Sequence, residues 1–283
     1  MPLIATHTGL SPEAYEFIAG LVYEHSRIRL GPDKQALVTG RLGKRLRQLG
    51  LDSFDAYCAV LRSPRGDEEI EQLVDMMSTN HTHFFREAAH LDFLRDHILP
   101  EMTPRLARKR EPLRVWSAAS SSGEEPYTIA IVLAEFARLQ GGLDWRIEGS
   151  DISTRILATA RAGIYAAERV KLPEPELLPR YFQRGTGANS GHYRVKDALR
   201  KAITFHHLNL LQPTYPVARE QHVIFCRNVM IYFDQETQQQ LVAKLVRQLA
   251  PGGYLIVGHS ESLMGVRHGL KQVKPAVYRS EEC

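Results

Sequence analysis

The 283-residue sequence has few cysteines, no long apolar run and no strong excess of either charge. Its three cysteines, Cys58, Cys226 and Cys283, are odd in number and far apart, so they form neither a disulfide framework nor a zinc-binding spacing. A reducing cytoplasm is therefore the expected location. The longest apolar runs, such as residues 129–137, fall far short of the ~20 residues that span a bilayer, so we expect no membrane insertion.

The N-terminus and the overall charge argue against two further classes of protein. Residues 1–15 contain no basic segment followed by an apolar one, so we expect no signal peptide. The net charge of +4 is too weak to indicate nucleic acid by itself. The basic segments also lack the interleaved aromatic residues of a single-strand binder. We therefore expect no nucleic-acid partner.

The first 76 residues have the pattern of a small helical bundle, with apolar side chains recurring at spacings of three and four. Ser11 is the predicted N-cap of the first helix. Asp33 is predicted to cap the second helix, and Gly50 to end it. We expect an all-helical domain over residues 1–76, followed by an interdomain linker and helix over residues 77–112.

Strand and helix patterns alternate over residues 113–283. The predicted strands are 113–118, 145–151, 222–228 and 252–260, and the helices are 124–140, 153–165 and 235–250. Such alternation predicts an α/β fold, a mostly parallel sheet with helices on both faces. Glycine-rich turns between short alternating segments at about 180–202 predict a small inserted antiparallel β subdomain.

Polar and acidic residues follow the predicted strands, where open parallel sheets bind their ligands. These residues are 120–125, 150–151, 209–210, 227–228 and 259–261. The first turn contains neither G-x-G-x-x-G nor G-x-x-x-x-G-K-[ST], so the pattern disfavours a phosphate ligand.

Two acids in these positions suit a nucleoside with a cationic tail. Asp151, at the end of the second strand, is placed to hold the hydroxyls of a ribose. Glu124 or Glu125 is placed to meet an ammonium group. S-adenosylmethionine has a ribose, an adenine and a cationic amino-acid tail, but no phosphate. The alternative is structural: first-turn acids complement a helix dipole, and Asp151 is a simple helix cap.

Several longer motifs occur in a fixed order along the chain, and together they resemble the chemotaxis receptor methyltransferase (CheR) family. The motifs are STNHTHFFRE (78–87), WSAASSSGEEPYTIA (116–130), SDISTRILATARAGIY (150–165), RYFQRGTG (180–187), FCRNVMIYFD (225–234) and PGGYLIVGHSESL (251–263). The resemblance implies a Rossmann-like class I methyltransferase sheet with an N-terminal helical domain. It also implies S-adenosylmethionine as cofactor, with S-adenosylhomocysteine as product.

The family's functional positions can be carried over to this sequence residue by residue. The implied cofactor contacts are Asn80, Thr82, Arg86, Ala119, Glu125, Asp151, Asn209, Leu210, Arg227 and Asn228. Arg86 and Tyr232 match the residues that the family uses in catalysis. The implied reaction transfers a methyl group to glutamate side chains of the cytoplasmic domain of methyl-accepting chemoreceptors. A receptor C-terminal tail peptide is expected to add to the inserted β subdomain.

A basic helix face is the expected docking surface for such an acidic partner. Arg41, Lys44 and Arg45 fall on one side of the second predicted helix. The alternative is an ordinary solvated face, as most charge runs are. Two functional alternatives also stay open: a non-catalytic receptor-binding adaptor of the same fold, and a methyltransferase with another acceptor. The histidine pairs 81/83 and 206/207 have no third ligand at a suitable spacing, so we expect no metal.

Overall fold

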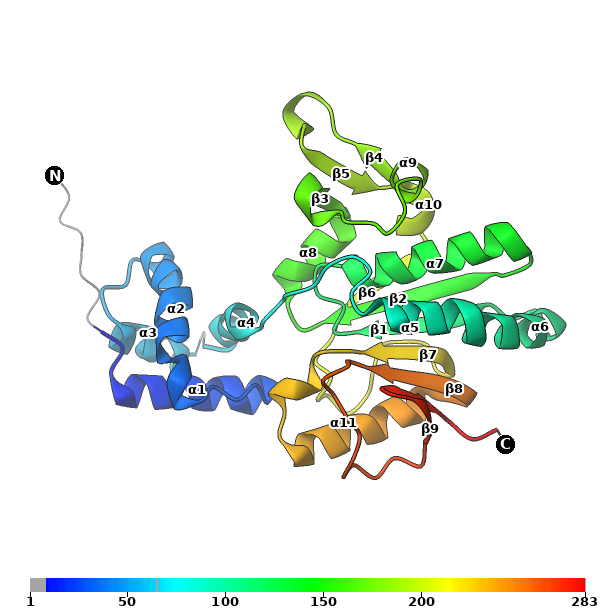
Figure 1. Ribbon diagram of the computed structural model, residues 1–283. Helices are drawn as coiled ribbons and strands as arrows, with labels where there is room; N and C mark the ends of the chain where they lie inside the picture. The colour runs from blue at the N-terminus through cyan, green and yellow to red at the C-terminus, as the bar shows by residue number, and fades with distance from the viewer. Residues whose placement is uncertain (1–8, 65, 283) are drawn as a thin grey trace. The chain divides into compact units, whose positions relative to one another are not determined.

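The protein divides into two compact units (Figure 1). The computed structural model describes residues 9–64 and 66–282. One unit, the helical unit, comprises Met1–Thr79 and Tyr232–Asp234, and the other, the sheet unit, comprises Asn80–Ile231 and Gln235–Cys283. Cys58 and Cys226 are buried free thiols, whereas Cys283 lies outside the described residues.

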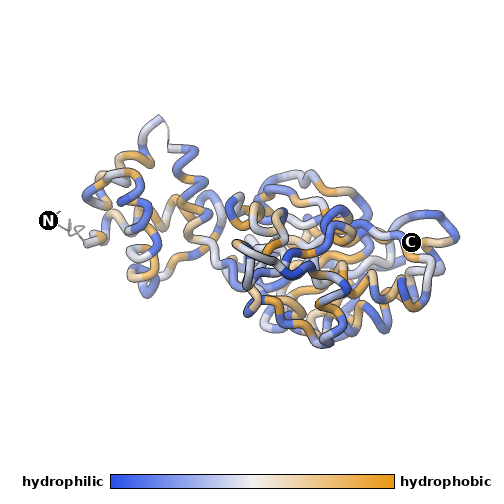
Figure 2. The backbone as a smooth tube through the Cα atoms, turned by 90° about the horizontal axis from the view of Figure 1, so that it is seen from above, coloured by the Kyte–Doolittle hydropathy of each residue, from blue (hydrophilic) through white to orange (hydrophobic). Residues whose placement is uncertain are grey.

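The helical unit buries one apolar face of each helix, and Figure 2 shows the resulting alternation of hydrophobic and hydrophilic residues. Its elements are α1 (Pro12–Ser26), the 3-10 turn η1 (Pro32–Lys34), α2 (Gln35–Leu49), α3 (Phe54–Leu61) and α4 (Gly66–Met77). The segment Tyr232–Asp234 starts at the last residue of the 3-10 turn η5 (Met230–Tyr232) and belongs with this unit, where the hydroxyl of Tyr23 in α1 donates to Asp234.

Two of the three predicted helix ends are confirmed. The Ser11 Oγ accepts a hydrogen bond from the Ala14 N–H at 3.1 Å, and Gly50 ends α2 in the left-handed region with φ 67°. The prediction for Asp33 is wrong, because the 3-10 turn η1 precedes α2 and no side chain caps that helix. Pro32 explains the shift, since its fixed φ starts a helical turn earlier than the pattern indicated.

The sheet unit contains a seven-stranded sheet in the order β6-β2-β1-β7-β8-β10-β9. The strands are β1 (Leu113–Ala118), β2 (Trp145–Asp151), β6 (Ile203–His207), β7 (Gln221–Cys226), β8 (Leu249–Val257), β9 (Lys271–Lys274) and β10 (Val277–Arg279). The strands from β6 to β8 run parallel, while β10 and β9 are antiparallel. The flanking helices are α5 (Ala88–Phe93), the π-helix η2 (Leu94–Ile98), α6 (Leu99–Lys109), α7 (Glu124–Gln140), α8 (Thr154–Ala162) and α11 (Gln235–Gln248).

β1 lies inside the main sheet between β2 and β7, which explains why its sequence lacks hydrophobic alternation. Val115 and Trp116 point to opposite faces, and both are fully buried. The Trp116 indole donates to the Ser150 Oγ at 3.0 Å, so even its polar atom has a partner. This rigid centre fixes the loops that follow β1, β2 and β7 along one edge of the sheet.

A small sheet in the order β3-β5-β4 is inserted between α8 and β6 and lies above α7 in Figure 1. Its elements are β3 (Ile164–Ala166), η3 (Ala167–Arg169), α9 (Leu177–Tyr181), β4 (Phe182–Arg184), η4 (Gly187–Asn189), β5 (His192–Val195) and α10 (Asp197–Arg200). The segment predicted as a hairpin supplies β4 and β5, but β3 was not anticipated. Gly163, with φ 61°, ends α8 early, and Ile164 and Tyr165 then pair as a strand.

These elements confirm the predicted fold class: a mostly parallel sheet with flanking helices, an inserted antiparallel subdomain and an N-terminal all-helical unit. Within the described ranges, every helix is too short or too polar to cross a membrane.

Candidate functional site

The loop joining β1 to α7, residues 119–123, has a tight backbone. Ala119, Ser121 and Gly123 have φ of 65°, 50° and 95°, a region that side chains other than glycine enter at a cost. Such conformations concentrate at functional sites. Glycine is required at the last position, because a Cβ on Gly123 would lie 2.9 Å from the Cβ of Ala160. The loop thereby brings the N-terminus of α7 to the end of β1.

Three backbone N–H groups of this loop, those of Ser120, Ser121 and Gly123, have partners inside the protein. Ser120 donates to the Ser150 carbonyl at 2.7 Å, and Gly123 donates to the Ser120 carbonyl at 3.1 Å. The Ser121 N–H donates to the Asp151 Oδ2 at 2.8 Å. A phosphate cradle needs free amides, so this loop does not resemble one.

Asp151 is the last residue of β2 and is buried. Besides Ser121, its carboxylate accepts from the Ser153 N–H at 3.0 Å. The simple helix-cap alternative for Asp151 is wrong, because the Ser153 hydroxyl is the side chain that caps α8, by accepting from Ile156. Asp151 instead fixes the first loop against the end of β2.

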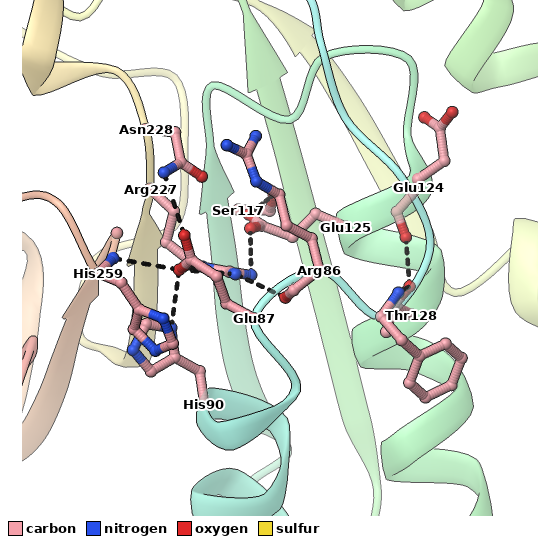
Figure 3. Close-up of polar contacts among 12 residues, drawn as sticks. Arg86, Glu87, His90, Ser117, Glu124, Glu125, Thr128, Arg227, Asn228 and His259 are labelled. Carbon is pink, nitrogen blue, oxygen red and sulfur yellow. Dashed lines mark hydrogen bonds and ion pairs between the residues drawn. The ribbon is translucent and has the colours of Figure 1, made fainter. Parts of the chain in front are cut away.

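Arg227, directly after β7, is the centre of a buried polar network (Figure 3). Its side chain is 2% exposed and lies between two carboxylates. The Nη1 donates to the Glu125 Oε2 at 2.9 Å, and the Nη2 donates to the Glu87 Oε2 at 3.0 Å. The Nη2 also donates to the Arg86 carbonyl at 2.6 Å. One guanidinium therefore fixes α7 and the segment before α5 at the same edge of the sheet.

Glu125 has the surroundings of a ligand-binding acid. Its Oε1 accepts from the Ser117 hydroxyl at 2.7 Å, and its side chain is 14% exposed. Each carboxylate oxygen has a second lone pair, so Glu125 can accept from a ligand without losing Ser117 or Arg227.

Glu124 differs from its neighbour in being fully buried. It accepts from the Ser122 hydroxyl at 2.6 Å and is paired with Arg169 of η3. Glu124 thus connects α7 to the small sheet. Of the two acids, Glu125 is the one that a ligand can reach, and its contact with the cofactor stays a prediction.

Glu87 and Glu261 order the other loops at the rim. Burial alone raises the pKa of the Glu87 carboxyl, but Arg227 and further hydrogen bonds outweigh burial and hold the pKa below its ordinary value. Glu261 accepts from the N–H groups of Asn228, Gly258 and Met230 at 2.6–2.7 Å. Its burial raises the pKa of the carboxyl despite these donors. Asn228, with φ 58°, is held in a left-handed conformation between Glu261 and Glu87.

The remaining predicted cofactor residues in the sheet unit lie in the segments around this rim. The Asn80 carbonyl accepts from the Ser121 hydroxyl at 3.2 Å, and the Arg86 Nη1 donates to the His81 carbonyl at 2.9 Å. Thr82 is half-buried in the same segment. Beyond β6, Asn209 is half-buried with its Oδ1 accepting from the Leu211 N–H, and Leu210 is buried.

The helical unit contains one predicted catalytic residue, Tyr232, and the three predicted docking residues. Tyr232 belongs with the helical unit, so its relation to Arg86 stays a prediction. Arg41 donates to the carbonyls of Met76, Met77 and Ser78 at 2.8–3.1 Å. Arg45 forms a bidentate ion pair with the buried Glu69. Both arginines therefore stabilise the bundle, and of the three predicted docking residues only Lys44 is exposed.

The donor set fits S-adenosylmethionine better than a nucleotide phosphate. Asp151 and Glu125 place two carboxylates after neighbouring strands, and carboxylates suit hydroxyl and ammonium groups rather than a phosphate. The amides of Ser120, Ser121 and Gly123 and the guanidinium of Arg227 are engaged within the protein. The sequence reasoning missed the roles of Glu87, Glu261 and Arg169. The first two lie inside the quoted motifs, and Glu261 also follows β8 at the rim.

Known proteins resemble the chain over both units. Residues 13–78 match the family described as "CheR methyltransferase, all-alpha domain", and residues 80–279 match "CheR methyltransferase, SAM binding domain". Two similar proteins are each named "Chemotaxis protein methyltransferase". The one from Escherichia coli (strain K12) is 44% identical over 254 residues, and the one from Salmonella typhimurium (strain LT2) is 42% identical over 254 residues. Both matches cover 89% of this chain and 85% of the relative. "Chemotaxis protein methyltransferase 2" of Pseudomonas aeruginosa is 40% identical over 268 residues, 94% of this chain and 92% of that protein.

Proposed function

The chain belongs to the CheR methyltransferase family, and on this premise we propose that it methylates glutamate side chains of chemoreceptors. The products are glutamate methyl esters and S-adenosylhomocysteine. The observation that carries the proposal is a pair of carboxylates, Glu125 and Asp151, at the carboxyl ends of two neighbouring strands of the main sheet. Glu125 follows β1 and Asp151 ends the adjacent β2.

The cofactor-binding residues have separate roles in this proposal. Asp151 holds the ribose, and Glu125 holds the ammonium group of the methionine end. Asn209, Leu210 and Asn228 flank the adenine and the reactive end. Arg227 positions Glu125 through the buried ion pair, so its effect on the cofactor is indirect.

The chemistry requires orientation rather than a strong base. S-adenosylmethionine supplies, when bound, a methyl group activated by its sulfonium. The acceptor glutamate, with an ordinary pKa of about 4.3, is already ionised near neutral pH. The protein's task is to hold that carboxylate in line, which lowers the barrier through proximity. Arg86 is assigned to one carboxylate oxygen, which its planar donors suit, and Tyr232 is assigned as the second catalytic residue.

Receptor docking is assigned to the exposed side of α2, with Lys44 as the first residue to test. A charge reversal at Arg41 or Arg45 would break contacts to α4 as well, so it does not isolate docking. Lys44→Glu should weaken receptor methylation, more so at low salt, because surface attraction is screened by ions. Lys271→Glu, at an exposed position of β9, is the matched control.

A receptor tail peptide is assigned to an edge of the small sheet. β3 and β4 are the outer strands of the order β3-β5-β4, and an extended peptide can pair with such an edge. Removing the tail from the receptor should lower methylation of tail-bearing receptors only.

The deciding experiment is a labelled-methyl assay on receptor-containing membranes. Arg86→Ala should lower the rate about a hundredfold, because it removes the group that orients the acceptor. Tyr232→Phe should lower the rate about tenfold or more. Arg146→Ala, which removes an exposed arginine paired with Asp144, should leave the rate unchanged. Wild-type rates in both site variants would contradict the assignment.

A binding measurement separates the two alternatives. Calorimetry should detect both S-adenosylmethionine and S-adenosylhomocysteine. Cofactor binding without label transfer to any receptor would instead identify an adaptor. Label transfer to a different acceptor would identify another methyltransferase.

A further inference from the structure

Glu87, His90 and His259 bring one carboxylate and two imidazoles together beside the Arg227 network (Figure 3). One potential ligand atom from each residue lies within 4.8 Å of the other two. The His90 Nδ1 is 3.4 Å from the Glu87 Oε2, and the centroids of the two imidazole rings are 4.4 Å apart. The residues come from α5, the segment before it and the loop after β8, so the fold assembles them from distant parts of the sequence.

His90 has no hydrogen-bond partner to account for its burial. Its side chain is 2% exposed, and neither ring nitrogen forms a hydrogen bond with any part of the chain that the structure describes. A buried polar group without a partner is destabilising, so it needs an explanation. A neutral imidazole carries one ring nitrogen with a lone pair, which a metal ion can accept.

The three donors suit a borderline transition-metal ion. Two imidazole nitrogens and one carboxylate form a common set of three protein ligands for Zn²⁺, with the fourth position open. Ligand atoms at about 2.0–2.1 Å from a tetrahedral ion lie about 3.4 Å apart, which matches the separation of Glu87 and His90. Ca²⁺ and Mg²⁺ prefer oxygen ligands and do not suit the histidines. His259 is exposed and supplies an entry path.

We propose that Glu87, His90 and His259 form a divalent transition-metal site that binds Zn²⁺, and Co²⁺ or Ni²⁺ more weakly. This proposal departs from the sequence-based expectation of no metal, and the site uses other histidines than the pairs 81/83 and 206/207. In the structure, His206 is instead paired with Glu148 at 2.8 Å, and His207 contacts the Ile152 carbonyl at 2.9 Å.

Arg227 limits the affinity of the site and links it to the cofactor. The Glu87 Oε2 accepts from Arg227 and also from the His259 N–H at 3.2 Å. A metal ion and the guanidinium must therefore share this oxygen, and their like charges repel. Glu87 and Glu125 share Arg227, so a metal ion on Glu87 is coupled to Glu125, to which the proposed function assigns the cofactor. Linkage requires that metal and cofactor change each other's affinity by the same factor, and we expect repulsion between the two cations to make that coupling unfavourable.

The test is a titration of the untagged full chain with Co²⁺, followed by displacement with Zn²⁺. Wild-type protein should develop the visible absorption of tetrahedral Co²⁺ with micromolar affinity, and Zn²⁺ should abolish it. His259→Ala, a change at an exposed side chain, should weaken binding by about tenfold or more. Glu87→Gln should do the same. His97→Ala, at an exposed histidine on η2, should bind like wild type.

Two outcomes would overturn the site: no Co²⁺ spectrum at micromolar free metal, or equal affinity in wild type and His259→Ala. A second measurement tests the link, because saturating Zn²⁺ should weaken S-adenosylmethionine binding about fivefold in wild type but not in His259→Ala. The metal titration needs neither cofactor nor receptor, so it is independent of the proposed methyl transfer.

Discussion

Two regions meet the first turn of α7, and they use neighbouring acids in opposite ways. On the side of the small sheet, Glu124 is fully buried and is paired with Arg169 and Ser122. The Tyr165 hydroxyl donates to the Ser122 carbonyl at 2.7 Å and closes the same contact. On the side of the main sheet, Glu125 is partly exposed and shares Arg227 with Glu87.

The difference lies in which partner is buried. In the Glu124 region the carboxylate is buried and its arginine is 43% exposed, so water can solvate the cation if the pair is broken. In the Glu125 region the arginine is 2% exposed and the carboxylates reach the surface, where a ligand can meet them. The first arrangement attaches the small sheet, and the second holds carboxylates rigidly where a ligand can reach them.

The largest effect is expected from removing the buried cation. Arg227→Leu leaves Glu87 and Glu125 facing each other without a cation, and breaking a buried ion pair costs about 3–5 kcal/mol. The free energy of unfolding, measured by urea denaturation, should fall by that amount. Arg95→Leu is the control, because its pairs with Asp92 and Asp96 are half-exposed and should cost less than about 1 kcal/mol. Equal losses in the two variants would show that Arg227 is not the centre of the network.

The next effect separates the two acids directly. Glu124→Gln should lower the free energy of unfolding by about 1–3 kcal/mol, because it weakens a buried charged hydrogen bond. Its affinity for S-adenosylmethionine should stay close to wild type. Glu125→Gln should show the reverse: a small loss of stability and about tenfold weaker cofactor binding, equivalent to about 1.4 kcal/mol. Calorimetry and denaturation of the same preparations test both. An exchange of these two phenotypes would reverse the assignment of the acids.

The elements of the fold could be predicted from the sequence, but the ion pairs that separate Glu124 from Glu125 could not. Periodicity predicts β2 and α7 at their observed bounds, because local pattern and turn residues determine regular elements. The polar rim follows from the parallel part of the sheet, since parallel strands end at the same edge. Ion pairs across the fold are not local. Arg227 lies about a hundred residues from Glu125, and no spacing rule pairs them.

The docking surface shows the same limit in the helical unit. Helical spacing correctly places Arg41 and Arg45 on one side of α2. It does not indicate that α4, with Glu69 and its terminal carbonyls, would contact that side. A charged face becomes a docking surface only where no other element of the fold covers it, and this information is tertiary.

The smallest effect on stability is expected at Glu135, through which α7 makes a second contact with the segment around the small sheet. Glu135 accepts from Arg180 at 2.7 Å and from the Tyr181 hydroxyl at 2.5 Å, both in α9. Burial opposes ionisation, but the hydrogen bonds from Arg138, Tyr181 and Arg180 prevail and lower the pKa of Glu135 to about 2. Because the folded pKa lies below the unfolded one, the carboxylate stabilises the fold above the unfolded pKa. That contribution is lost as the pH falls toward 2.

Glu135→Gln should therefore lower the free energy of unfolding by about 1–2 kcal/mol at pH 7, after allowance for the partial exposure of the group. The gap between variant and wild type should narrow as the pH falls below about 4.3. Denaturation at pH 7 and at successively lower pH tests this, with Glu168→Gln on the exposed part of η3 as control. A gap that stays constant with pH would mean that Glu135 acts through its shape alone. In that case only Glu124, and not the whole of α7, would hold the small sheet by charge.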